Sequence, residues 1–578
     1  MINKIFDRKV ILIGIVFIAL FLRFFELGIN PPSLTWDETA WGYNAYSLGI
    51  DGRDEFGRFL PLDYLESFGD FKPPVYAYLD IIPVKLFGLN EFAARFPSAL
   101  FGTLTVLITF FLAKRIFSHQ SKTSFWLVQN LFTPSGKRRD SGVVAYAPPQ
   151  NDEWIPLLSS LLLAISPWHI NLSRAAFEAN VVSFFIVAGV WLFLAAVQSK
   201  KWLLLLSVSS FVLSIYTFNT ARIVSPILFI LLSLMFWKAL WRIKYQVAIA
   251  IVIGIVLILP IARFLVSPQA GLRFKEVNIF SDIEVIERTN QEIENDKNVM
   301  WSRILHNRRF AYAVEYIKHY LDNLSPSFLF IKGDGNPKFS TQDIGQLYLW
   351  DLPFIVAGIL FLFKKREGVW WIIPIWILVA IVPAATARET PHALRIETTL
   401  PTFQIITALG ILGFLGWIKK ALIVTNLKIL IVFFTFSFLF FNFVYYLHGY
   451  YAHYPREYSG EWQYGYKESI EYVRSVQDEY DQIRITSALG RPYIYYAFFT
   501  KTFPEAFRKT AIVKRDAFGF VHVSGFLKYR FADSLDSIKA KTRKVLFIDT
   551  PGRVHPKGDI LKKFYLLNGD EALVAYRL

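Results

Sequence analysis

Residues 9–27 read KVILIGIVFIALFLRFFEL, an apolar run long enough to form a helix that crosses a lipid bilayer. No small-residue cleavage site follows a short apolar core, so we expect this run to be retained as a span. Similar runs recur along the chain. Of its 578 residues 54% are hydrophobic and 19% are charged, whereas a soluble protein carries about 25% charged residues. The sequence therefore predicts an α-helical protein with many membrane spans.

Hydropathy predicts about eleven spans in all. Alternate connections between them are basic, for example at Lys200-Lys201, Lys364-Lys365-Arg366 and Lys419-Lys420. The positive-inside rule places these connections in the cytoplasm, so we expect the amino terminus inside and, with an odd number of spans, the carboxyl terminus outside. The net charge of +16 then reflects topology rather than nucleic-acid binding. The expected spans are residues 9–27, 92–117, 154–167, 176–198, 202–218, 222–241, 245–266, 347–363, 369–386, 395–417 and 428–447.

Three long regions are then expected on the outer face. They are the loop at 28–91, the loop at 267–346 and the tail. We expect a membrane domain over residues 1–449 and a small extracytoplasmic α/β domain over 450–578. In the tail the pattern predicts a helix at 463–478, strands at 482–487 and 544–548, and a hairpin of 564–568 with 572–577.

The inner loop at 118–153 contains turn formers and charges but little periodicity, so we expect it to be poorly ordered.

The first outer loop begins NPPSLTWDE at residues 30–38. The proline pair stops a helix, and Thr35 can cap the next one, which we expect to run to about Leu48. Asp37 and Glu38 then fall in its first turn, where carboxylates favour the helix dipole. That structural role alone would explain an Asp-Glu pair after a cap. The functional interpretation is a general base at the membrane surface.

Residues 69–78 of the same loop read GDFKPPVYAY. The two prolines can begin a second helix at the membrane interface. Lys72, directly before them, is suited to bind a phosphate group. The alternative is a lysine that only reaches toward lipid headgroups. The second span then opens with EFAARFPSAL at residues 91–100.

Three motifs in this order, WDE after the first span, FKPPxY before the second and ARFPSALFG at its start, resemble a known family. They are similar to the membrane glycosyltransferases of the protein O-mannosyltransferase and aminoarabinose-transferase type, which have the GT-C fold and form family 39. The resemblance is strongest over residues 1–120 and continues more loosely to about 447.

The resemblance implies a sugar donor on a polyprenyl phosphate, taken from the outer leaflet. It implies that Asp37 is the catalytic acid-base, with Glu38 as its neighbour, and that Lys72 contacts the lipid phosphate. The aminoarabinose enzymes carry an acidic residue directly before that lysine, as part of a metal site. Phe71 stands there in this chain, so we expect no metal and no other cofactor.

Further ionisable residues lie near the outer ends of spans, where an anionic headgroup would meet several of them. Arg174 and Glu178 also have the i,i+4 spacing of a simple ion pair. His169 and His392 have no second ligand at i+3 or i+4, and the chain has no cysteine, which disfavours a metal site. The donor-binding candidates besides Lys72 are Arg95, Arg174, Glu178, Arg222, His392 and Arg395, with Arg388 on the same face.

The expected activity is a metal-independent, inverting transfer of a hexose or pentose, mannose-like in the first instance, at the plasma membrane. The acceptor is a hydroxyl of a protein, a lipid or a glycan. Three alternatives stay open on the sequence: a lipid-linked glycan polymerase or ligase, a lipid transporter or flippase, and a non-catalytic outer-face binding protein. A transporter would place ionisable residues near the bilayer midplane and repeat its spans, and the sequence has neither feature.

Overall fold

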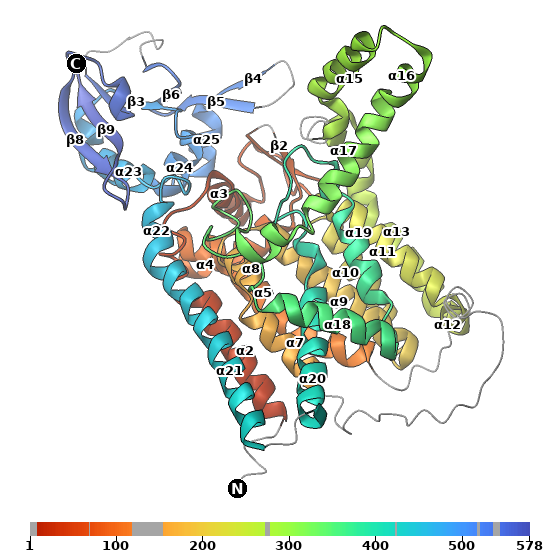
Figure 1. Cartoon of the computed structure of the whole chain (residues 1–578). Helices are drawn as coiled ribbons and strands as arrows, with labels where there is room; N and C mark the ends of the chain where they lie inside the picture. The colour runs from red at the N-terminus through yellow and green to blue at the C-terminus, as the bar shows by residue number, and fades with distance from the viewer. Residues whose placement is uncertain are drawn as a thin grey trace, which may run out of the picture.

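The computed structural model describes residues 8–68, 70–117, 154–271, 278–421, 425–516, 521–535 and 544–578. The inner loop expected to be poorly ordered, 118–153, lies outside these ranges. Figure 1 shows a bundle of helices with a sheet domain at one end; the amino terminus lies at the other end of the bundle. The bundle contains α2 (Arg8–Phe24), α5 (Glu91–Ile116), α7 (Trp154–Ala164), α8 (Pro167–Arg174), α9 (Glu178–Gln198), α10 (Leu203–Ile215), α11 (Ala221–Met235), α12 (Trp237–Arg242), α13 (Lys244–Leu265), α18 (Asp351–Lys365), α19 (Ile372–Ile381), α20 (Thr402–Ala421) and α21 (Thr425–His448).

In the described part of the chain, four helices are long and apolar enough to cross a membrane, or up to five if a bent pair is one span. The bent pair is α7 with α8, which meet at 53°. The bend has a local cause, because Pro167 at the start of α8 cannot donate a backbone hydrogen bond to α7. Several other expected spans are shorter helices, such as α10 with 13 residues and α19 with 10. The membrane character is confirmed, and the count of eleven spans stays a prediction.

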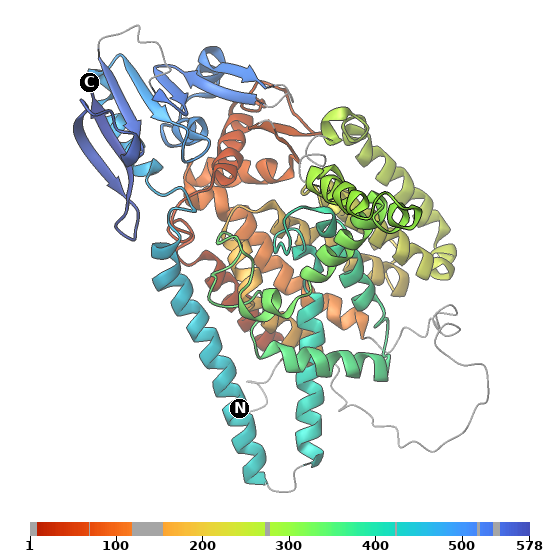
Figure 2. The ribbon, with the colours of Figure 1, turned by 45° about the horizontal axis from the view of Figure 1, so that its top comes forward.

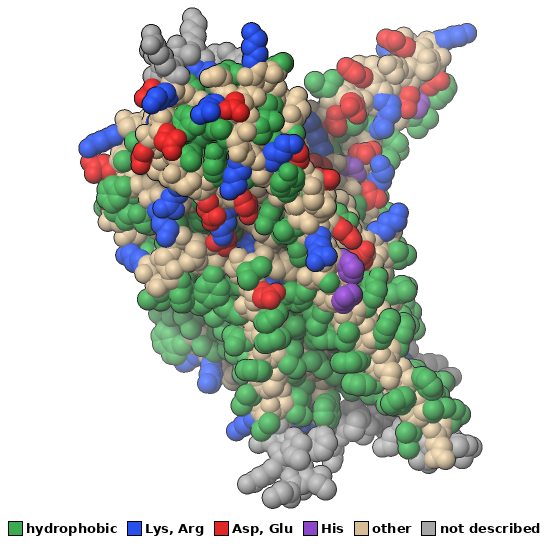
Figure 3. Space-filling view, turned by 90° about the vertical axis from the view of Figure 1, so that its left-hand side faces the viewer, with side chains coloured by type: hydrophobic (Ala, Val, Ile, Leu, Met, Phe, Trp, Pro, Cys, Tyr) green, Lys and Arg blue, Asp and Glu red, His purple; other side chains and the backbone are tan. Residues whose placement is uncertain are grey.

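The types of surface side chain differ between the helical bundle and the sheet domain. Figure 3 shows hydrophobic side chains covering the helical part, with charged side chains gathered mainly over the sheet domain above it. Helix α21 shows the clearest exposed apolar surface, with Phe433 61% and Phe441 65% exposed. Side chains of this kind are stable at such exposure in lipid rather than in water.

The first outer loop folds as α3 (Trp36–Asp51), a short antiparallel hairpin of β1 (Leu65–Ser67) and β2 (Asp70–Lys72), and α4 (Val75–Phe87). Both helices expected in this loop are confirmed. Thr35 caps α3 in a capping box with Glu38, and Gly52 ends it in a left-handed conformation with φ of 71°. The hairpin was not expected, and it places Lys72 at the end of a strand.

A long connection between α13 and α18 forms three helices that project from the same end of the bundle as the sheet domain (Figure 1); with this end turned forward, they lie apart from the sheet domain (Figure 2). Their polar and apolar residues alternate with the period of a helix. They are α15 (Ile283–Asn295), α16 (Met300–Leu305) and α17 (Arg308–Asp322).

After α21, the short helix α22 (Tyr454–Glu457) leads into a seven-stranded sheet with the order β4-β5-β6-β3-β7-β9-β8. The central strand β3 runs parallel to β6 and β7, and the other pairs are antiparallel. The expected helix and the two strands are present as α23, β3 and β7. The hairpin is present as β8–β9, but its first strand lies at 559–565 rather than at the expected 564–568, and β4 to β6 were not predicted. The elements are α23 (Tyr466–Val476), β3 (Gln482–Thr486), α24 (Pro492–Phe499), α25 (Pro504–Thr510), β4 (Ile512–Arg515), β5 (Val521–Phe526), β6 (Tyr529–Ala532), β7 (Val545–Asp549), β8 (Asp559–Tyr565) and β9 (Glu571–Arg577).

The sheet domain packs directly on the first outer loop, mainly through α24 and α25. The hydroxyl of Tyr495 donates to the carbonyl of Leu34 at 3.0 Å, and the hydroxyl of Tyr43 donates to the carbonyl of Thr502 at 3.0 Å. Arg508 donates to the hydroxyl of Ser47 at 3.0 Å. The domain therefore supports the loop from the side opposite the bundle.

The carboxyl of Glu55 is buried in this contact. It accepts hydrogen bonds from Ser67 at 2.8 Å and Asn44 at 3.4 Å, and Tyr493 of α24 donates to it at 3.4 Å. Burial raises the pKa of Glu55 from 4.5 to about 8. A neutral carboxyl therefore joins the loop to the domain at neutral pH.

This buried carboxyl predicts that the contact weakens as the pH rises. The folded protein retains a proton that the unfolded chain releases near pH 4.5, so the associated stability is complete below that pH and is lost as the pH rises through about 8. Melting temperatures measured between about pH 5 and 9 should fall with pH, and Glu55→Gln should flatten that slope. Asp63→Asn, a change in the same loop, should keep it. An unchanged slope in Glu55→Gln would contradict the prediction.

Candidate active site

Asp37 and Lys72, 35 residues apart in the chain, form an ion pair between Oδ1 and Nζ. Asp37 lies in the first turn of α3 with its side chain 46% exposed, whereas the Lys72 side chain is 8% exposed. The Lys72 ammonium also lies 5.1 Å from the ring of Trp41 and 4.9 Å from that of Phe68. An accessible carboxylate and a largely buried cation thus share one point on the outer loop.

Other charged groups surround this pair. Glu178, the first residue of α9, interacts electrostatically with Lys72, Asp37 and Asp70. The hairpin of β1 and β2 and the start of α9 therefore meet at the same place. Glu178 accordingly stays in the group expected around the donor.

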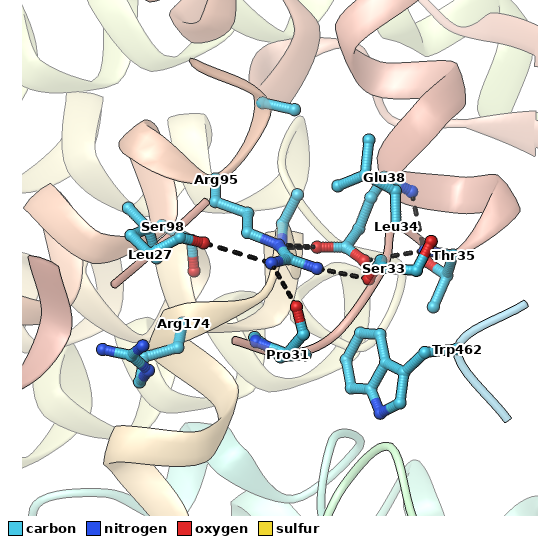
Figure 4. Close-up of polar contacts among 12 residues, drawn as sticks. Leu27, Pro31, Ser33, Leu34, Thr35, Glu38, Arg95, Ser98, Arg174 and Trp462 are labelled. Carbon is cyan, nitrogen blue, oxygen red and sulfur yellow. Dashed lines mark hydrogen bonds and ion pairs between the residues drawn. The ribbon is translucent and has the colours of Figure 1, made fainter. Parts of the chain in front are cut away.

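Glu38 and Arg95 form a second ion pair, in which both side chains are fully buried (Figure 4). Arg95 Nε donates to Glu38 Oε1 at 2.8 Å, and the backbone amide of Ala176 donates to the same oxygen at 2.9 Å. The other oxygen, Oε2, accepts from the amide of Thr35 at 2.8 Å. Both oxygens are engaged and shielded from solvent, so Glu38 has a structural role here; its catalytic role stays a prediction.

Arg95 completes this structural unit by binding backbone carbonyls of the first loop. Its Nη1 donates to the carbonyls of Leu27 at 3.1 Å and Pro31 at 2.8 Å, and its Nη2 donates to Ser33. These groups would otherwise be buried without partners, which is costly. The N–H groups of Arg95 hold the loop, and its predicted contact with the sugar donor stays a prediction.

Arg174 has the same role on the other side of the loop. Its guanidinium is fully buried and donates to the carbonyls of Leu22 and Asn30, each at 2.8 Å, and to the hydroxyl of Tyr450 at 3.1 Å. Arg174 is thus held by the chain that leaves the first span rather than by the alternative pairing with Glu178, and its predicted contact with the sugar donor stays a prediction.

Arg222 differs from these two arginines, because its buried Nε and Nη2 have no hydrogen-bond partner in the described residues. Its guanidinium lies 5.3 Å from the ring of Phe264, on which Phe71 also packs at 6.2 Å. Asp70 acts on it electrostatically. Arg222 thus lies beside the β2 strand that carries Lys72, and its Nε and Nη2 can donate hydrogen bonds to an anion.

His392 and Arg395 belong to a different group, around Asp334. His392 Nδ1 lies 3.9 Å from Asp334 Oδ2, and burial lowers the pKa of His392 to about 3, so the ring is neutral at physiological pH. Arg395 donates to the carbonyl of Glu389 at 3.3 Å. Arg388 donates to the carbonyls of Asn278 and Ser281 and so joins two loops. A neutral His392 is a weak candidate for binding an anionic donor.

Two residues near the site were not predicted. The Lys338 ammonium lies 5.1 Å from the ring of Trp36 and is close enough to Asp37 to interact with it; burial lowers the pKa of Lys338. Glu397 is fully buried beside α9, with neither carboxylate oxygen bonded within the described chain. Lys338 carries no sequence signal. Glu397 does carry a sequence signal, because it falls inside the expected span 395–417, and an ionisable residue within a span is a candidate functional residue.

Within the described ranges, no group of three or more His, Asp or Glu residues is arranged to hold a metal ion. His169 Nδ1 lies 2.6 Å from Arg23 Nη2, which makes it a hydrogen-bond acceptor for that arginine.

Comparison with known proteins shows which family and fold this chain resembles. The family model of dolichyl-phosphate-mannose-protein mannosyltransferases matches residues 71–129, which include Lys72 and Arg95. A protein of Aquifex aeolicus (strain VF5) described as uncharacterized is 28% identical over 235 residues, which are 39% of this chain and 38% of that protein. The match thus spans well under half of that relative.

Among solved structures, ArnT from Cupriavidus metallidurans in the apo state superposes with a TM-score of 0.52, at 12% identity and over 97% of both chains. The same protein bound to undecaprenyl phosphate gives a TM-score of 0.50 with the same identity and coverage. In its motifs and in its fold, this chain is therefore similar to the membrane glycosyltransferases of the GT-C type.

Proposed function

We propose that this protein transfers a sugar from a polyprenyl phosphate to an acceptor hydroxyl on the outer face of the membrane. The observation that carries the proposal is the contact between Asp37 and Lys72, which joins an accessible base to a cation. The solved ArnT with undecaprenyl phosphate has the same fold and binds a lipid phosphate. The resemblance of the first-loop motifs to that family points to the same chemistry.

In the proposed reaction, Lys72 exchanges Asp37 for the phosphate of the donor. The donor phosphate is a diester, with one negative charge and two free oxygens, so it can replace the carboxylate as the partner of the ammonium. When the sugar leaves, the lipid phosphate gains a second negative charge, and the ammonium then binds it more strongly. Arg222, with its unbonded Nε and Nη2, is placed to bind the same headgroup. Donor binding would therefore release Asp37 from its ion pair.

Asp37 then accepts the proton of the acceptor hydroxyl as that oxygen attacks the anomeric carbon. The bond from that carbon to the phosphate oxygen breaks, and the lipid phosphate leaves with the electron pair. Lys72 and Arg222 stabilise the charge on the leaving group, which needs no protonation. Attack opposite the leaving group inverts the anomeric configuration.

The finer features of the proposal extend the sequence analysis. We propose a mannose-like hexose or pentose as the sugar, with no metal in the reaction. The topology is an amino terminus in the cytoplasm, about eleven spans over residues 1–449, and an extracytoplasmic domain over 450–578. The first outer loop, which carries Asp37 and Lys72, lies at the same end of the bundle as the sheet domain, and this location supports the proposed topology (Figure 1).

The test is to incubate the purified protein in lipid nanodiscs with a panel of polyprenyl-phosphate sugars and to measure the release of lipid phosphate. The panel should include mannose, glucose, galactose and aminoarabinose as the sugar, with serine peptides, lipids and oligosaccharides as acceptors. Release from at least one combination is expected. Turnover of pyrophosphate-linked oligosaccharides alone would indicate a glycan ligase or polymerase instead.

Lys72→Met should impair donor use strongly, because it removes the proposed phosphate ligand. We expect kcat/KM for the donor to fall by about 10²–10³. Lys72→Arg keeps the charge and should retain part of the activity. The matched control is Lys467→Met, which breaks an ion pair at 2.5 Å between α23 of the sheet domain and Glu91 at the start of α5 and should leave donor kinetics unchanged. Equal effects of the two methionine variants would exclude a specific role for Lys72.

A further inference from the structure

A groove of about 550 Å³ lies on the sheet domain between α23 and β8. Strand β8 is the last in the sheet, so the groove lies at the outer edge of the domain (Figure 1). One wall carries Tyr464, Glu471 and Tyr472, and the other carries Lys562, Phe564 and Tyr565. None of these residues belongs to the site around Asp37.

The apolar part of the groove is made of aromatic rings. The rings of Tyr472 and Phe564 are 5.9 Å apart. Phe564 is buried in the sheet, whereas Tyr565 is 50% exposed. The Lys562 ammonium lies 5.2 Å from the Tyr472 ring and 5.6 Å from the Phe564 ring. Ring faces carry partial negative charge and attract C–H groups with partial positive charge, such as those on one face of a pyranose.

The polar part of the groove favours a neutral ligand with many hydroxyls. The two carboxylates, Glu468 and Glu471, balance the two ammonium groups, Lys562 and Lys563, and Lys563 is also paired with Glu571 at 2.6 Å. Glu471 is exposed and makes no hydrogen bond within the described residues. A carboxylate can accept two hydroxyl donors at once. The balance of charge is unsuited to a phosphate or a nucleic acid.

A peptide added as an extra strand fits this edge less well. The pairing of β8 with β9 is interrupted twice, between Ile560 and Lys562 and between Phe564 and Tyr565. Such irregularities disturb the regular row of backbone donors and acceptors that an added strand requires. Lysines on an edge strand also oppose further pairing.

We infer that this groove is a carbohydrate-binding site, which holds a neutral oligosaccharide with Tyr472 and Tyr565 against the sugar faces and Glu471 on the hydroxyls. The inference rests on the groove alone and not on the proposed transfer reaction. A site of this kind would keep a glycan near the enzyme independently of catalysis.

The test uses the full-length protein in nanodiscs and saturation-transfer NMR with mannotetraose and isomaltotetraose, together with an array of neutral and acidic oligosaccharides. Binding of a neutral oligosaccharide is expected, and Tyr565→Ala and Glu471→Gln should each weaken it about tenfold. Phe503→Ala is the control, because Phe503 is equally exposed at 50% on the same domain but lies outside the groove.

Binding should persist in Asp37→Asn, so a failure of the proposed reaction and a failure of this site are distinguishable. Melting temperatures of the variants should match that of the parent, because both altered side chains are exposed. The inference is overturned if no oligosaccharide binds, if neither groove variant changes the binding, or if a serine-rich peptide displaces the sugar.

Discussion

Asp37→Asn should reduce sugar transfer by about 10²–10⁴ while leaving the protein folded, because it removes the proposed general base. The amide keeps the size of the side chain but cannot accept the proton of the acceptor hydroxyl. Asp37 is about half exposed and lies at the start of α3, so the change should cost little stability. Single-turnover transfer with the donor identified from the panel is the measurement.

The same variant separates donor binding from chemistry. Loss of the Asp37 carboxylate frees Lys72, so the affinity for a polyprenyl phosphate should be retained or increased. Asp63→Asn is the matched control: Asp63 pairs with Arg58 at 2.8 Å in the same loop, and its loss should leave transfer unchanged. Transfer at the parental rate in Asp37→Asn would remove the proposed mechanism.

Arg95→Met should have the largest effect on stability, with a loss of about 3–5 kcal/mol. The variant leaves the Glu38 carboxylate buried without its cation, and it leaves the carbonyls of Leu27, Pro31 and Ser33 without a donor. The measurements are the melting temperature in nanodiscs and the yield of protein extracted from the membrane.

Arg58→Met provides the comparison for this effect. The Arg58–Asp63 and Arg95–Glu38 pairs have the same separation of 2.8 Å, but the first is about one-third exposed and the second is fully buried. An exposed pair contributes about 0–1 kcal/mol, so Arg58→Met should change the melting temperature little. Adding Glu38→Gln to Arg95→Met should recover part of the loss, because it removes the unpaired charge. Similar losses in the two methionine variants would show that burial does not decide the effect.

The sequence alone predicts the elements whose cause is local. Helix α3 follows from the proline pair and Thr35, and both helices of the first loop are present. Asp37 and Lys72 were selected independently by motif, and the fold brings them into contact. The β1–β2 hairpin was missed because each strand has only three residues, too short for an alternating pattern.

The structural roles of Arg95 and Arg174 could not be predicted from the sequence, for a tertiary reason. A charged residue at the outer end of a span is equally suited to an anionic ligand or to a cluster of backbone carbonyls. The chain between α2 and α3 is irregular and buried, so its carbonyls need donors. Sequence shows the arginines but not the burial of that connection. Strand β4 was missed for a different reason, because it is exposed along its whole length and has no apolar face to recognise.

The contacts of the first outer loop also order the events of biosynthesis. Asn30 Nδ2 donates to the carbonyl of Tyr450, which is 420 residues later in the chain, and Leu34 is held by Tyr495. At about 5–20 residues per second, a ribosome needs tens of seconds to add that length. The loop that carries Asp37 therefore acquires its final shape only when the last span and the sheet domain have been made. A truncated or stalled chain lacks these contacts and therefore has no completed loop.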